Sequence, residues 1–169
     1  MRNVFVDGYN VINSWPELRT IVEYSLETAR QKLIDILQNY AVYKGYKVFI
    51  VFDGHLKKGN LENKEVYSGV VVIYTKEGET ADSYIEKSVN DIGRKTEVCV
   101  VTSDFLEQQL AFQRGAIRAS SAEFYFEVKG VEERIKTNIQ KFKVEKRNRL
   151  EDQMDKEVLE KLEKIRRNR

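Results

Sequence analysis

Short apolar runs separate longer amphipathic stretches along this chain. The runs are apolar throughout instead of alternating with polar residues, which is the pattern of strands that are covered on both faces, as in a parallel sheet. They predict strands over residues 3–7, 46–53, 70–74 and 97–102, and a brief strand, which includes Arg118, is expected at 116–119.

The stretches between these runs have helical periodicity, with apolar residues three and four positions apart. They predict helices over residues 26–43, 80–92, 104–115 and 120–142 and, after a charged break at 146–149, over 150–165. Residues 8–16 and 55–68 are expected to be loops. Strands that alternate with helices predict an α/β fold with a mostly parallel central sheet and a C-terminal helical extension.

The charge of the chain is unevenly divided. Residues 129–169 carry 14 Lys and Arg against 9 Asp and Glu, whereas residues 1–128 carry 15 against 18. We therefore expect one domain over 1–128, with basic helices over 129–169 packed on it or extending from it. A basic segment suits an anionic partner such as RNA, although a solvated helical surface has the same composition. The apolar stripe at 150–165 fits packing on the body, dimerisation or a partner, so both a monomer and a weak homodimer stay open.

The sequence gives no sign of a membrane protein. No apolar run approaches the ~20 residues that a membrane span needs. The chain begins directly with a predicted strand and not with a signal peptide, so we expect a cytoplasmic protein. Cys99 is the single cysteine, which excludes an intramolecular disulfide.

Four aspartates fall where the predicted strands would deliver them to one edge of the sheet. Asp7 and Asp53 end the first and second strands. Asp82 lies in the first helical turn after the third strand, and Asp104 lies just past the fourth. Sites in parallel sheets form beyond the carboxyl ends of the strands. Each of the last two acids also has a structural interpretation, Asp104 as a helix N-cap and Asp82 as a complement to the helix dipole.

Clustered carboxylates repel one another, and a hard divalent cation relieves that repulsion. The four aspartates are therefore candidate catalytic residues and ligands for Mg²⁺ or Mn²⁺, a combination that suits phosphodiester hydrolysis. The candidate substrate-binding residues are Asn10, Lys57, Lys58, Thr102 and Ser103. Capping a turn is an equally good interpretation of Asn10. His55, the only histidine, follows Asp53 but is expected simply to be exposed.

Four motifs in order resemble the YacP-like branch of the NYN domains, which are relatives of the PIN-domain nucleases. The motifs are Val-Asp-Gly-Tyr-Asn-Val-Ile at 6–12, Val-Phe-Asp-Gly-His at 51–55, Glu-Thr-Ala-Asp at 79–82 and Val-Thr-Ser-Asp at 101–104. The resemblance covers nearly the whole chain. It implies a PIN-like three-layer α/β/α sandwich and a metal-dependent endoribonuclease that acts with the ribosome in messenger RNA decay.

The resemblance also implies roles for individual residues. Asp7, Asp53, Asp82 and Asp104 correspond to its acidic metal site, and Asn10 corresponds to the polar companion of the first motif. One position departs from the family pattern. The pattern has a small residue such as alanine after the second aspartate, and this chain has Gly54 there.

The hypothesis that follows is a hydrolytic one. Mg²⁺ or Mn²⁺ held by Asp7, Asp53 and Asp82 would activate water for in-line attack on RNA and leave 5′-phosphate and 3′-hydroxyl ends. Positive charge for RNA would come from Lys57, Lys58 and the basic C-terminal helices. Aromatic residues are candidates to stack on unpaired bases, although packing is their commoner role. They are Tyr9, Trp15 and Tyr67.

Two alternatives come from other functional classes. The first is a non-catalytic RNA- or ribosome-binding module whose acidic cluster is structural, which chelator-indifferent binding without cleavage would favour. The second is a phosphoacceptor receiver domain, which also places Asp at a strand end. That class is disfavoured because the paired acids after its first strand and the lysine after its last strand are missing here.

Overall fold

A computed structural model describes residues 1–54 and 62–168 of the protein. Within them lies a six-stranded sheet in the order β3-β4-β2-β1-β5-β6. The strands are β1 Asn3–Asp7, β2 Lys47–Phe52, β3 Asn63–Tyr67, β4 Val70–Tyr74, β5 Val98–Val101 and β6 Ile117–Ala119. All neighbouring pairs are parallel except β3 and β4, which are antiparallel.

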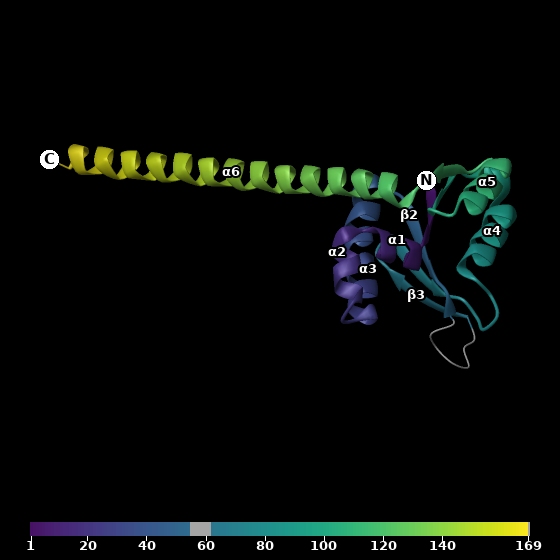
Figure 1. Ribbon diagram of the computed structural model, residues 1–169. Helices are drawn as coiled ribbons and strands as arrows, with labels where there is room; N and C mark the ends of the chain where they lie inside the picture. The colour runs from purple at the N-terminus through teal and green to yellow at the C-terminus, as the bar shows by residue number, and fades with distance from the viewer. Residues whose placement is uncertain (55–61, 169) are drawn as a thin grey trace. The chain divides into compact units, whose positions relative to one another are not determined.

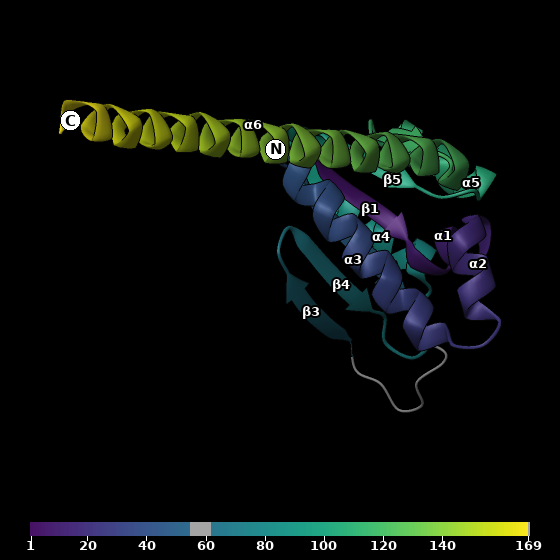
Figure 2. The same ribbon diagram turned by 90° about the vertical axis from the view of Figure 1, so that its left-hand side faces the viewer.

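Helices cover both faces of this sheet. They are α1 Gly8–Ser14, α2 Pro16–Val22, α3 Leu26–Lys44, α4 Ala81–Ile92, α5 Phe105–Gln113 and α6 Ser121–Arg167, with a 3₁₀ turn at Gly93–Lys95. Figure 1 shows α2 and α3 on one side of the sheet and α4 and α5 on the other, and Figure 2 shows α3 lying over the sheet, roughly along the direction of its strands. The mostly parallel α/β fold that the sequence predicts, and the α/β/α sandwich that the family resemblance implies, are therefore confirmed.

The sheet has a hydrophobic core on each of its faces, and the apolar strands contribute to both. On the side of α4 and α5, Phe5, Val51 and Val100 from the strands pack with Ile85 and Val89 of α4. Because strand side chains alternate in direction, the intervening residues point to the other side. Every residue from Val4 to Val6 is consequently buried.

The second core includes the beginning of α6. Trp15 is only 2 % exposed and lies against Phe124, with ring centroids 5.8 Å apart. Its indole N–H donates to the carbonyl of Ser121 at 2.9 Å. Trp15 therefore packs inside the protein, and stacking on RNA is not its role.

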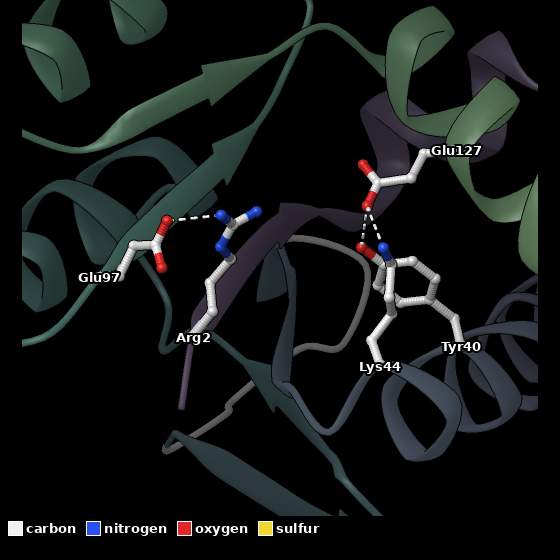
Figure 3. A network of polar contacts seen from close by, with 5 residues as sticks. All are labelled: Arg2, Tyr40, Lys44, Glu97 and Glu127. Carbon is white, nitrogen blue, oxygen red and sulfur yellow. Dashed lines mark hydrogen bonds and ion pairs between the residues drawn. The ribbon is translucent and has the colours of Figure 1, made fainter.

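A polar network also ties α6 to α3 (Figure 3). The Tyr40 hydroxyl donates to Glu127 Oε1 at 2.8 Å, and Lys44 Nζ lies 3.7 Å from the same oxygen. Burial raises the pKa of Tyr40, so its hydroxyl remains a donor. Nearby, Arg2 pairs with Glu97 and thereby links the start of β1 to the approach to β5.

The expected loop over residues 8–16 was wrong, because two short helices occupy this region. Asp7 has an extended backbone and caps α1, its Oδ1 accepting from Asn10 N at 3.4 Å. Pro16, expected in that loop, begins α2. Proline is well suited to a first helical position, where its missing N–H leaves no intrahelical bond unmade.

Two further expectations about elements were wrong. Part of the expected loop over 55–68 is the edge strand β3, whose residues are exposed or half-buried and so lack an apolar signature. The charged stretch at 146–149 does not interrupt α6, which is one helix through it. Lys, Arg and Asn are compatible with a helix, and this stretch contains neither Gly nor Pro.

The chain divides into two units, residues 1–131 and 132–169, whereas the boundary proposed from the sequence fell after residue 128. The first unit holds the sheet and the first turns of α6. In the second unit residues 132–167 are helical, and the side chains of Leu150, Met154 and Val158 are exposed. No helix in the described part of the chain is long and apolar enough to cross a membrane.

Candidate active site

Asp7 is the residue around which the candidate site forms. It ends β1 between the neighbouring strands β2 and β5, and its backbone lies level with Val51 of β2. Gly8 follows it directly into α1. A Cβ at Gly8 would lie 2.3 Å from the Phe52 ring, so the turn at Asp7 depends on glycine.

Two other aspartates act on Asp7 electrostatically. Burial is the largest effect and raises the pKa of the Asp7 carboxyl to about 7, while the backbone N–H of Asn10 opposes the rise. The charge of Asp82, a hydrogen bond with Asp82 and the charge of Asp53 raise this pKa further. The structure thus brings Asp7, Asp53 and Asp82 together at the carboxyl edge of the sheet.

Asp104 has a local partner. It caps α5, with its Oδ1 accepting from Leu106 N at 2.9 Å. It also lines a cavity between α4 and α5, which it shares with Asp82. Asp104 is therefore a helix cap beside the acidic group, and its charge is not among the largest effects on the pKa of Asp7.

Asn10 connects separate elements at this edge. Its Oδ1 accepts from the backbone N–H of Ser103 at 3.0 Å and from the hydroxyl of Ser121 at the start of α6. Its amide oxygen is thus used within the protein, where it positions the β5–α5 loop. Substrate contact by this oxygen would require breaking those bonds.

Thr102 and Ser103 differ sharply in exposure. Thr102 is fully buried, and its Oγ1 accepts from Asp104 N at 3.1 Å. Its carbonyl accepts from Gln108 Nε2 at 2.6 Å, so Thr102 supports the loop from inside. Ser103 is exposed and remains in a position where its hydroxyl can meet a substrate. His55, Lys57 and Lys58 lie outside the described residues.

Gly54, which follows Asp53, sits tightly against the end of β4. Its backbone N–H donates to Thr75 Oγ1 at 2.9 Å, and that hydroxyl donates to Glu79 O at 2.7 Å. A Cβ at position 54 would lie 1.8 Å from the Thr75 carbonyl oxygen. The alanine that the family pattern suggests would not fit this backbone.

Comparisons with known proteins show the family and the fold. Residues 4–167 match the YacP-like NYN domain. The chain belongs to this family. An uncharacterized protein YacP from Bacillus subtilis (strain 168) is 44% identical over 146 residues, which cover 85% of this chain and 84% of the relative.

Solved structures of relatives have the same fold. The crystal structure of Rae1 (YacP) from Bacillus subtilis is 42% identical, with a TM-score of 0.75 over 99% of this chain and 95% of that chain. A tryptophan-to-leucine mutant of the same protein has a TM-score of 0.73 at 39% identity, over 84% of each chain. Membership of this PIN-like family supports a nuclease role directed at RNA.

The acids at this edge of the sheet suit a hard cation only with added water. Among residues 1–54 and 62–168, no group of three or more His, Cys, Asp and Glu side chains is arranged to hold a metal ion. Mg²⁺, however, commonly takes one or two carboxylates and fills its remaining positions with water and substrate oxygens. Asp7 and Asp82, whose carboxyl groups interact, form such a pair. The fit is that of a two-carboxylate, water-rich site.

Sequence reasoning missed two residues that position this edge, Thr75 and Ser121. Both are fully buried polar residues that satisfy distant groups, Thr75 at Gly54 and Ser121 at Asn10. The position of Thr75 directly after an apolar strand was the one available signal. Nothing near Ser121 in the sequence points to Asn10, which is 111 residues away.

Proposed function

We propose that this protein is a Mg²⁺- or Mn²⁺-dependent endoribonuclease that hydrolyses RNA phosphodiester bonds, with messenger RNA on the ribosome as its substrate. The observation that carries the proposal is the meeting of Asp7, Asp53 and Asp82 at the sheet edge. Membership of the YacP-like NYN family supports it. A pure RNA binder gains nothing from negative charge concentrated where an anionic strand must approach.

The electrostatics of Asp7 support a role for a cation. A carboxyl group whose pKa is about 7, raised by burial and by two neighbouring acids, lacks a sufficient counter-charge. A bound divalent cation would supply that charge, together with Lewis-acid activation of water and of the phosphodiester. Asp7 and Asp82 would hold it, and Asp53 would add negative charge beside them.

Other residues at the carboxyl edge of the sheet hold the loop between β5 and α5 in place. Asn10 fixes the loop that carries Ser103, and Thr102 fixes the cap at Asp104.

Hydrolysis by water should leave 5′-phosphate and 3′-hydroxyl ends, so 2′,3′-cyclic phosphate products would contradict the proposal. Contacts of RNA with the basic residues of 129–169 should make binding weaken as salt is raised.

Cleavage of messenger RNA, free and on translating ribosomes, tests this function directly. The proteins to compare are wild type, Asp7→Asn and Asp91→Asn, each with Mg²⁺ or with EDTA. Asp91 is an exposed acid on α4 and serves as the matched control. We expect cutting that needs the metal, falls about 100-fold or more in Asp7→Asn and is unchanged in Asp91→Asn.

The same experiment separates the alternatives. Cutting of ribosome-bound RNA alone would show that the ribosome presents the substrate. Suppose that the protein cuts RNA in neither setting but still binds RNA or the ribosome equally well with and without EDTA. That result would support the binding module and overturn the nuclease.

A further inference from the structure

A cavity of about 180 Å³ lies between α4 and α5, next to the acidic edge. Both helices begin at the carboxyl edge of the sheet, so their first residues place Asp82 and Asp104 at one end of it. One turn further along α4 comes Glu86, and Arg114 follows the end of α5. The cavity therefore has carboxylates at the end nearest the acidic edge, and farther along it has the ion pair of Glu86 and Arg114.

The walls between these polar ends are aliphatic. Ile85 and Val89 of α4 and Val100 of β5 are buried and form the inner wall. Leu106 and Leu110 of α5 also line the cavity, yet they are 68% and 39% exposed. Water thus reaches an apolar surface that a flat, apolar-faced ligand would cover favourably.

The volume limits what can bind. Pockets that enclose whole small molecules occupy roughly 300–1,000 Å³. This cavity is smaller, so it suits a single ring system and leaves any attached sugar and phosphate outside. Carboxylates at its entrance also oppose entry of a phosphate group.

The far end offers both an acceptor and donors. Arg114 Nη2 lies 3.5 Å from Glu86 Oε1, and Arg114 Nη1 donates to Asn90 Oδ1. The arginine charge is thus balanced within the protein and does not form an open anion site. The Glu86 carboxylate can still accept from an exocyclic amino group, which is how acidic side chains recognise cytosine N4.

We propose that this cavity, formed by α4 and α5, binds one unpaired base of the RNA strand and favours a base with an exocyclic amino group over uracil. Proteins read RNA sequence chiefly on unpaired bases that are held between side chains and hydrogen-bonded at their edges. Asp82 belongs both to the cavity and to the acidic group at Asp7. A base seated there places its own phosphodiester at the candidate active site. This inference rests on the proposed function only for its link to the cleavage position.

Binding without cleavage tests the cavity independently. The probes are four 5′-labelled RNA heptamers of uridine, with A, C, G or U at the centre, and affinity is measured by fluorescence anisotropy in EDTA. Wild type should bind at least one of the amino-bearing heptamers about tenfold more tightly than the all-uridine heptamer.

Two variants and one control locate the preference. Glu86→Gln keeps the side chain's size but adds a donor, so the preference should fall several-fold and shift toward uridine. Leu110→Trp should fill the cavity and reduce all four affinities to one common value. Asp91→Asn removes one charge from the same helix outside the cavity and should leave the preference intact.

The outcomes distinguish this inference from the nuclease itself. Equal affinities for the four heptamers, an absence of binding, or a preference unchanged in both Glu86→Gln and Leu110→Trp would overturn the base site. A preference that depends on Glu86 and Leu110, in a protein that cuts no RNA with Mg²⁺ or Mn²⁺, would uphold the base site while the proposed function fails.

Discussion

At the scale of single residues, the chemistry of this protein centres on Asp7. The carboxyl group accepts from the first turn of its own helix and interacts with Asp82. Burial and like charge both favour its protonated form. The folded protein therefore holds a proton on Asp7 at pH values where the unfolded chain has lost it. Burial likewise raises the pKa of Cys99 to about 11, so that thiol is unreactive near neutral pH.

This difference predicts how stability depends on pH in metal-free protein. The ordinary pKa of the group is 3.8, and its folded value is about 7. Between these values the folded state binds more protons than the unfolded state, so the free energy of unfolding falls as the pH rises from 4 to 7. Asp7 should account for a fall of about 2–4 kcal/mol.

Urea denaturation in EDTA at several pH values measures this fall. Asp7→Asn cannot ionise and should flatten the profile, with its greatest gain over wild type above pH 7. Asp91→Asn, altered at an exposed position of α4, should retain the wild-type slope. Identical slopes in wild type and Asp7→Asn would show that another group is responsible.

At the scale of elements, α1 joins parts of the chain that are far apart in sequence. Through Asn10 it contacts the end of β1, the β5–α5 loop and the first residue of α6. The side-chain oxygen accepts two hydrogen bonds in a partly buried position. This one amide thus holds the candidate active-site loop to the body.

Removing that amide should loosen the loop. Asn10→Ala leaves the Ser103 N–H and the buried Ser121 hydroxyl without their acceptor, which should cost about 1–3 kcal/mol of unfolding free energy. Amide exchange at Ser103 should accelerate as well. Asn13→Ala, at an exposed position of the same helix, is the matched control and should change neither quantity. Unchanged exchange at Ser103 in Asn10→Ala would refute this role.

At the scale of the whole molecule, the first turns of α6 belong to the core of the first unit. Phe124, Val128 and Val131 are buried. Within the described chain, no residue beyond Val131 is buried. The second unit therefore adds length and charge to the protein and leaves the core of the sheet unchanged.

Two truncations test this division. A chain of residues 1–131 should unfold in one cooperative transition, close in midpoint to that of the full chain. A chain of residues 1–120 loses three buried apolar side chains, each worth about 2–5 kcal/mol, and should not fold, since whole domains are stable by only about 5–15 kcal/mol. Fluorescence of Trp15, the only tryptophan, reports both transitions. A cooperative transition in the chain of residues 1–120 would contradict the placement of the first turns of α6 in the core of the first unit.

The sequence by itself determined the elements whose signals are local. Continuous apolar runs specified the strands β1, β2, β4 and β5, because a strand covered on both faces needs apolar residues along most of its length. Capping residues mark helix starts locally, as the reciprocal hydrogen bonds of Ser120 and Glu123 do at the start of α6. The gathering of Asp7, Asp53 and Asp82 also followed from the sequence, because parallel strands bring their carboxyl ends to one edge.

The tertiary structure alone decided what depends on distant partners. The strand β3 forms because β4 supplies its hydrogen bonds, although its side chains carry no apolar pattern. Trp15 is buried against the start of α6, and Thr102 is buried at the end of β5, where its N–H donates to Ala119 of β6. Neither burial has a local signal in the sequence. The cavity between α4 and α5 exists only where those two helices pack. Local pattern fixes which residues can form an element, whereas burial and pairing across the chain fix what each side chain can reach.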